Sequence, residues 1–143
     1  MNRLAVMFLS TFALFIPVGC ATYHPPLHDQ PTVRSSRDPQ LVSAIIEVES
    51  GGDPRAVSGD SVGILQIRPI MVDDVNRILG RRRYTLADRR DPRASIDMFW
   101  IYADHYSPGA SRETIARRWN GGPTGDRKPH TADYWRKVLS HLR

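Results

Sequence analysis

The sequence predicts a compact, mainly α-helical domain with one long irregular loop. Five segments carry the residues that typically begin and end helices, and no stretch alternates strictly enough to require a long β-strand. Between the first two helical segments, residues 51–66 are loop-like and have room for a minimal β-hairpin at most. Long irregular segments in compact domains are often functional.

The first two helices follow from a cap, prolines and glycines. Asp38 caps the first helix, Pro39 occupies its first turn, and the run LVSAIIEVES continues to two glycines that end it. The second helix begins near Pro69 and ends at Gly80. Its apolar side consists of Val72, Val75, Ile78 and Leu79.

The other three helices have equally clear boundaries. The third begins at Asp91-Pro92, runs through ASIDMFWIYADHY and is broken by a Pro-Gly pair. The fourth begins near Ser111 and ends at the sequence NGGP of residues 120–123. The fifth begins near Thr131, and its apolar side consists of Tyr134, Trp135, Val138, Leu139 and Leu142.

Residues 1–20 have the pattern of a secretory signal peptide. A short basic start contains Arg3, and an apolar run extends from residue 4 to residue 18. The run is too short for a membrane span, and its flanking residues are not those of one. The alternative to a cleaved signal peptide is a short anchor helix that stays in place. We therefore expect an exported protein.

Cys20 is the only cysteine, so it cannot form a disulfide within the chain. The Gly-Cys pair after an apolar run resembles a bacterial lipoprotein cleavage box, although Pro17 stands where that box usually has leucine. Lipidation of Cys20 would anchor the protein to a membrane, as a periplasmic or outer-membrane lipoprotein. Cleavage nearby, with a spare thiol and a periplasmic or secreted product, is the alternative.

The rest of the chain divides into a tether and one domain. Residues 21–38 are rich in proline and polar residues, which predicts a tether, and residues 39–143 suffice for one modest core. The formal net charge of +5 suits an anionic partner such as cell wall, nucleic acid or lipid headgroups. Export argues against nucleic acid.

Glu49 is the residue of greatest chemical interest. With about 100° of rotation per helical residue, it falls between Val42 and Ile45 on the apolar face, whereas Glu47 falls on the polar face. A carboxyl group among apolar side chains loses hydration, which raises its pKa and allows it to act as a general acid. The alternative is a frayed helix end at which Glu49 turns to water.

The sequence after Glu49 contains several further motifs in order. Glu49-Ser50 is followed by GGDP, by Gly-Ile-Leu-Gln ending at Gln66, and by a proline at residue 69. Further on come Arg-Trp-Asn-Gly-Gly-Pro, which contains Asn120, and Thr-Ala-Asp-Tyr-Trp, which contains Tyr134. Together these pieces resemble the soluble lytic transglycosylase (SLT) family of the lysozyme-like superfamily, over essentially all of residues 39–143.

The resemblance implies a lysozyme-like helical fold and an enzyme that acts on peptidoglycan. Such enzymes cleave the bond between N-acetylmuramic acid and N-acetylglucosamine and leave a 1,6-anhydro ring. By position, Glu49 would be the acid and then the base, with Ser50, Gln66, Asn120 and Tyr134 in substrate binding. This chain departs from the family pattern in having Trp119, Leu65 and Trp135 where the family has tyrosine, methionine and valine.

Other functions remain open at this point. A second carboxylate facing Glu49 would give a hydrolytic lysozyme instead, and the nearby candidates are Asp53, Asp60, Asp73 and Asp74. The domain could also bind glycan without cutting it, as a scaffold in an envelope-spanning machine.

Two unrelated chemistries receive less support. Residues 59–63 fit the G-x-S-x-G motif of esterases, but that motif requires alternating strands and helices around a parallel sheet. Only His24 and His28 have the four-residue spacing at which two histidines of one helix can bind a metal ion, and both lie in the tether. No metal site and no cofactor are predicted.

Overall fold

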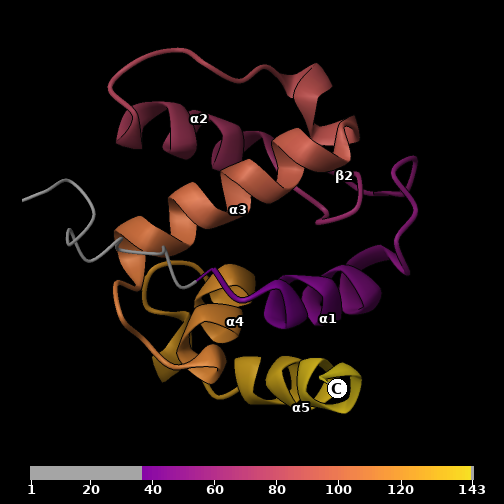
Figure 1. Cartoon of the computed structure of the whole chain (residues 1–143), viewed down its shortest axis with the longest axis vertical. Coiled ribbons are helices and arrows are strands. Elements are labelled where there is room, and N and C mark those ends of the chain that lie inside the picture. Colours follow the sequence, from indigo (N-terminus) through magenta and orange to yellow (C-terminus); the bar gives the residue numbers. More distant parts are fainter. Residues whose placement is uncertain (1–36, 143) are drawn as a thin grey trace, which may run out of the picture. The chain divides into compact units, whose positions relative to one another are not determined.

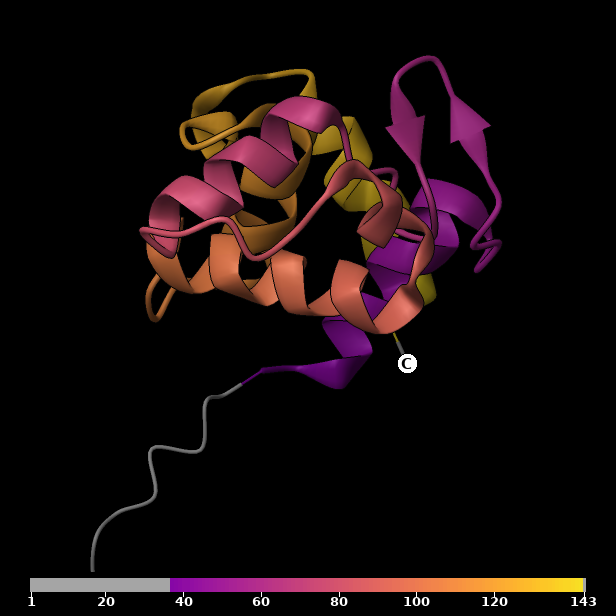
Figure 2. The same cartoon turned by 90° about the horizontal axis from the view of Figure 1, so that it is seen from above.

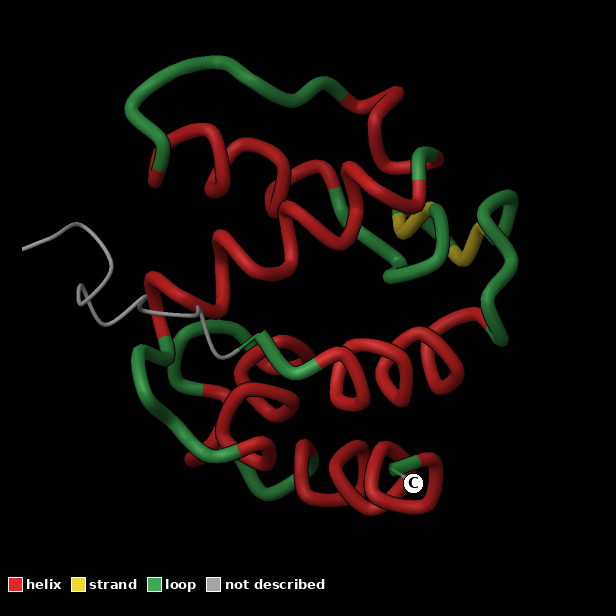
Figure 3. Tube along the Cα trace, viewed as in Figure 1, coloured by secondary structure: helices red, strands yellow, loops and turns green. Residues whose placement is uncertain are grey.

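A computed structural model of the chain describes residues 37–142. In this part of the chain helices dominate and the strands are very short (Figures 1 and 3). The order is α1 (Pro39–Ser50), β1 (Val57–Ser58), β2 (Ser61–Val62), α2 (Pro69–Ile78), the 3-10 helix η2 (Leu86–Arg90), α3 (Pro92–Tyr106), α4 (Arg112–Gly121), the 3-10 helix η3 (Gly125–Arg127) and α5 (Thr131–His141). The predicted mainly α class is confirmed.

The helix ends follow the predicted signals. The carboxylate of Asp38 accepts hydrogen bonds from the backbone N–H groups of Gln40 and Leu41, at 3.0 and 3.3 Å, and Pro39 follows it. Asp91 and Ser111 cap α3 and α4 in the same way. These bonds satisfy N–H groups that have no partner within the helix, which fixes where each helix begins.

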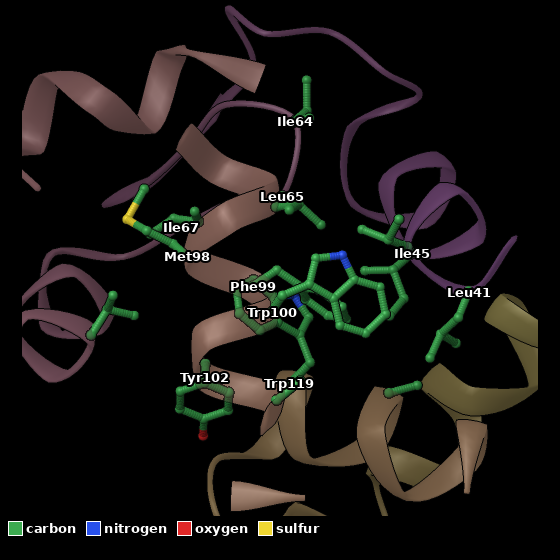
Figure 4. Packing of buried hydrophobic residues seen from close by; sticks show 14 of the residues in the cluster. Leu41, Ile45, Ile64, Leu65, Ile67, Met98, Phe99, Trp100, Tyr102 and Trp119 are labelled. Carbon is green, nitrogen blue, oxygen red and sulfur yellow. The ribbon is translucent and has the colours of Figure 1, made fainter. Parts of the chain in front are cut away.

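The core joins two groups of helices. The helices α1, α4 and α5 pack together, α2 packs on α3, and α3 also contacts α4 (Figure 1). Fully buried Phe99 of α3 lies at the centre, with its ring 4.8 Å from that of Trp100 and 5.0 Å from that of Trp119 (Figure 4). Edge-to-face ring pairs of this kind add to the free energy of apolar burial.

The irregular segment between α1 and α2 contains the predicted minimal hairpin. β1 and β2 pair antiparallel, with Val57 opposite Val62 and Ser58 opposite Ser61 (Figure 2). The residues after the hairpin turn inward, and Leu65 and Ile67 are buried in the core beside α3. The loop is thus attached to the core through its second half, while its hairpin extends outward.

Some sequence predictions fall on residues that the structure does not describe. The signal peptide of residues 1–20, Cys20 and most of the 21–38 tether lie outside residues 37–142. The last two tether residues are described: Arg37 forms an exposed ion pair with Asp104 at 3.3 Å, and Asp38 pairs with Arg112 as well as capping α1. Within residues 37–142, no helix combines the length and apolar character that crossing a bilayer requires.

Candidate active site

A groove of about 740 Å³ lies on the described domain. Its walls come from the end of α1, the loop after the hairpin, α2, α3, the end of α4 and the segment that leads to α5. Glu49, Gln66 and Asn120, three residues singled out from the sequence, all line it. Clefts of this size with a few convergent polar groups are typical small-molecule or polymer-binding sites.

Glu49 occupies the last turn of α1, next to Gly51, whose positive φ of 60° ends the helix. Its Oε1 accepts a hydrogen bond of 2.7 Å from the hydroxyl of Tyr134. Burial raises the pKa of Glu49 above its ordinary value, because desolvation penalises the charged form. Polar interactions with Tyr134 and Trp119 oppose this rise without cancelling it.

Tyr134 is brought to Glu49 by α5, which packs against α1. Its side chain is buried. The pKa of Tyr134 is raised well above its ordinary value. Burial is the main cause, and the negative charge of the neighbouring Glu49 contributes less. The hydroxyl therefore stays protonated and acts as a fixed donor to the carboxylate.

Gln66 is held in an uncommon backbone conformation, with a positive φ of 47°. Its Nε2 donates to the carbonyl oxygens of Gly63 and Ala56, at 2.9 and 3.3 Å. Because those carbonyls only accept hydrogen bonds, they fix which end of the amide is the NH₂ group. The amide oxygen of Gln66, which lines the groove, is thereby left as an acceptor.

Ser50 follows the acid but does not line the groove. Its hydroxyl donates to the carbonyl of Ile64 at 2.9 Å and accepts from the N–H of Gly52 at 3.2 Å. Ser50 thus ties the end of α1 to the inward-turning part of the loop. Through this contact it positions Glu49 against the loop.

Asn120 lies in the last turn of α4, exposed and lining the groove. The preceding Trp119 is buried against Phe99 on one side and lines the groove on the other. The helix end thereby places an apolar ring and an amide side by side along one wall. Both types of group are suited to contacts with a sugar.

The other candidate carboxylates fall into two classes. Asp53 accepts from the backbone N–H of Arg55 at 2.8 Å, which is the turn-forming role its position predicted. Asp60 is paired with Arg68 at 3.0 Å. Asp73 and Asp74 of α2, in contrast, line the groove together with Glu49.

Asp74 is already engaged in a small network. It forms an ion pair of 2.6 Å with Arg77 and accepts a hydrogen bond of 2.9 Å from the hydroxyl of Tyr106. Arg77 in turn donates to that hydroxyl at 2.6 Å. Asp73 is exposed, so it is the freer of the two carboxylates on this wall.

Several groove residues were not singled out from the sequence. Their spacing gives no signal, because Tyr102 occupies an ordinary apolar position of a helix, and Arg68 and Arg77 each stand alone in the sequence. The basic runs at residues 81–83 and 89–90 do not line the groove. The arginine, lysine and histidine residues that do line it are Arg68, Arg77, Lys128 and His130.

Two alternatives can be compared with this geometry. Ser61 of the G-x-S-x-G pattern lies in a two-residue hairpin strand that leads into a turn instead of a helix. This is not the strand–turn–helix geometry of an esterase elbow. Among residues 37–142, no cluster of three or more His, Cys, Asp or Glu is placed to hold a metal ion.

Comparison with known proteins gives a family match. The family described as "Transglycosylase SLT domain" matches residues 27–139. An endo-type membrane-bound lytic murein transglycosylase A of Klebsiella pneumoniae is 35% identical over 90 residues, which cover 61% of this chain and 44% of that protein. The protein of the same name from Salmonella paratyphi B is 34% identical over 90 residues, with the same shares covered.

The chain therefore aligns with less than half the length of these curated relatives. No solved structure matches the chain significantly.

Proposed function

The chain belongs to the transglycosylase SLT domain family, and from this premise we propose that it is a peptidoglycan lytic transglycosylase. It cleaves the β-1,4 bond between N-acetylmuramic acid and N-acetylglucosamine and forms 1,6-anhydro ends. The observation that carries the proposal is the desolvated carboxyl of Glu49, which lines a groove and is held at 2.7 Å by Tyr134.

In the first step Glu49 acts as a general acid. Its raised pKa keeps a larger share of the carboxyl protonated near neutral pH than an exposed glutamate would have. The proton passes to the glycosidic oxygen as the bond from that oxygen to the anomeric carbon breaks. Positive charge develops on the muramic acid ring, in an oxocarbenium-like transition state.

In the second step the same carboxylate acts as a base. It takes the proton from the 6-hydroxyl of the muramic acid, whose oxygen forms a bond with the anomeric carbon and closes the anhydro ring. Glu49 is then protonated again and ready for another cycle. Between the two steps, the hydrogen bond from Tyr134 stabilises the charged form.

The remaining predicted residues orient the sugars. The amide oxygen of Gln66 is free to accept from an acetamido N–H, and Asn120 offers its amide on the neighbouring wall. Ser50 acts indirectly, by fixing the loop that carries Gln66. Groups held in place in this way lower the entropy cost of reaching the reactive geometry.

Hydrolysis is the second candidate, and the exposed carboxylate of Asp73 in the same groove favours it. A carboxylate across the scissile bond from Glu49 activates a water molecule, and the product then has a reducing end. A scaffold that binds glycan without cutting it would need neither carboxylate.

We further propose that the protein is exported to the cell envelope, where peptidoglycan is its partner. The relatives' names describe membrane-bound murein transglycosylases, which supports this location. Lipidation of Cys20 remains a prediction from the sequence alone.

Mass spectrometry of muropeptides released from purified sacculi tests the proposal. The native protein is expected to release anhydro ends, and Glu49→Gln to release them at a rate roughly 10²- to 10⁴-fold lower, because Gln keeps the shape but cannot transfer the proton. Glu47→Gln is the matched control, since Glu47 is exposed on the same helix. Reducing ends would identify a hydrolase, and binding to sacculi without any product would identify a scaffold.

A further inference from the structure

Two buried tyrosines of the described domain, Tyr84 and Tyr102, have hydroxyl groups without a hydrogen-bond partner among residues 37–142. Tyr84 is 5% exposed and Tyr102 is 3% exposed. A buried hydroxyl without a partner costs free energy, so each one requires an explanation. The two differ in what their oxygen atoms face.

The oxygen of Tyr84 is sealed within the protein. It is inaccessible, has no partner, and belongs to a residue that does not line the groove. Tyr102 lines the groove, and its oxygen is not among the sealed, unpartnered atoms. The small exposed part of Tyr102 therefore includes its hydroxyl, which points away from the Phe99 and Trp100 rings (Figure 4).

The ring of Tyr102 is fixed between two other aromatic rings. It packs edge-on against Trp119, with centroids 5.8 Å apart and planes at 83°, and it lies 4.6 Å from the ring of Tyr106. A hydroxyl on a buried ring that is packed against other rings loses little conformational entropy when it forms a hydrogen bond. The geometry is that of a binding group already set in place.

The neighbours of Tyr102 place it along the groove. Trp119, which packs against the Tyr102 ring, lines the same groove as Glu49. The ring also contacts Tyr106, which forms a polar network with Asp74 and Arg77. The ring of Tyr102 thus packs against Trp119 and against Tyr106 of the polar network, in the groove that Glu49 also lines.

We propose that the hydroxyl of Tyr102 binds a neutral polar group of the glycan, a hydroxyl or an acetamido group, in the groove that Glu49 and Asp74 also line. This inference rests on the proposed function and adds a binding residue to it. Burial, with the nearby Tyr106 and Asp74, raises the pKa of Tyr102, so the hydroxyl remains neutral. A neutral hydroxyl can both donate to and accept from such groups.

The test compares Tyr102→Phe with Tyr84→Phe. Each variant removes one oxygen from a buried ring, and neither oxygen bonds to a described protein group, so both are expected to fold. In the Glu49→Gln background, where no cutting interferes, a soluble tetrasaccharide of N-acetylglucosamine is titrated by calorimetry. We expect Tyr102→Phe to raise Kd roughly three- to tenfold and Tyr84→Phe to leave it unchanged.

With Glu49 intact, Tyr102→Phe is expected to raise KM for solubilised glycan strands by a similar factor, while kcat changes less. The proposal would be overturned if Tyr102→Phe left Kd unchanged, or if Tyr84→Phe raised Kd as much as Tyr102→Phe does. The binding measurement does not depend on cutting. If the native protein released no product but lost affinity with Tyr102→Phe, the lytic function alone would be refuted.

Discussion

Glu49 illustrates how a single residue acquires chemistry from its position. It lies at the end of α1, where the apolar face of the helix leaves the core and meets the groove. One turn earlier on the same face, Ile45 is fully buried. The carboxyl is therefore desolvated enough for its pKa to rise, yet it remains accessible to a ligand in the groove.

The hydrogen bond from Tyr134 should tune the pH dependence of this acid. Tyr134→Phe removes a donor that favours the ionised carboxylate, so the pKa of Glu49 is expected to rise further. Because the acid must be protonated, kcat/KM falls as pH rises through that pKa, and in the variant this fall moves to higher pH. The loss of a hydrogen bond to a charged group is expected to lower kcat roughly ten- to hundredfold.

Initial rates of muropeptide release over a pH series measure both effects. A shift of the kcat/KM profile of Tyr134→Phe to lower pH would contradict the role given to Tyr134. Tyr84→Phe serves as the control, since it removes a buried hydroxyl that lies outside the groove.

At the scale of elements, the segment between α1 and α2 matters most. Its turn after β2 depends on Gly63, which has a positive φ of 83° and lies directly against η2. A Cβ atom at this position would be 1.8 Å from the carbonyl oxygen of Arg89. The Arg89 guanidinium in turn donates to the carbonyls of Asp60 and Ile67, at 2.9 and 3.1 Å, which holds the loop and η2 together.

Gly63→Ala is therefore expected to be much more damaging than Gly52→Ala. Gly52 has nearly the same φ, 84°, but its Cβ would meet no atom within 4 Å. The backbone strain of about 1–2 kcal/mol is common to both, and the clash adds about 1–3 kcal/mol to Gly63→Ala. Urea unfolding of the two variants measures the difference, and equal free energies of unfolding would refute the close approach of loop and η2.

On the scale of the whole molecule, the site exists only because distant segments pack together. Glu49 comes from α1, Gln66 from the loop, Trp119 and Asn120 from α4, and Tyr134 from α5. The packing of α5 on α1 brings together two residues 85 positions apart in sequence. The core that supports this packing also desolvates the acid, so fold stability and acid strength are linked.

This linkage predicts how stability varies with pH. A raised pKa means that the native state holds the Glu49 proton at pH values where the unfolded chain has released it. Stability from this group is thus complete below the ordinary value of 4.5 and is lost as pH rises through the higher native pKa. The Glu49→Gln side chain does not ionise, so the variant keeps this stability at all pH values. The free energy of unfolding of Glu49→Gln, relative to that of the native protein, should therefore increase from acidic to neutral pH.

Urea unfolding of the native protein, Glu49→Gln and Glu47→Gln across that range measures the effect. Glu47 is exposed, so the free energy of unfolding of Glu47→Gln should vary with pH in the same way as that of the native protein. An advantage of Glu49→Gln that stayed constant with pH would mean that the carboxyl is not desolvated by folding.

The five helices and the family could both be predicted from local sequence patterns. Caps such as Asp38 and Asp91, and glycines such as Gly51, act on the chain within a few residues, so their effect can be read locally. The motifs around Glu49, Gln66 and Tyr134 indicated the family, and the match over residues 27–139 confirms it. The helical wheel also indicated that Glu49 faces the apolar side, because that too depends only on helical rotation.

Which of these residues share a groove became clear only from the packing of the helices. Ser50, beside the acid in sequence, turns away to the loop backbone, whereas Tyr102, more than fifty positions from Glu49, opens on the groove. Leu139, expected on an apolar helix face, is 53% exposed. These outcomes depend on how helices pack across long sequence separations, and hydrophobic burial is non-directional, so local patterns do not encode them.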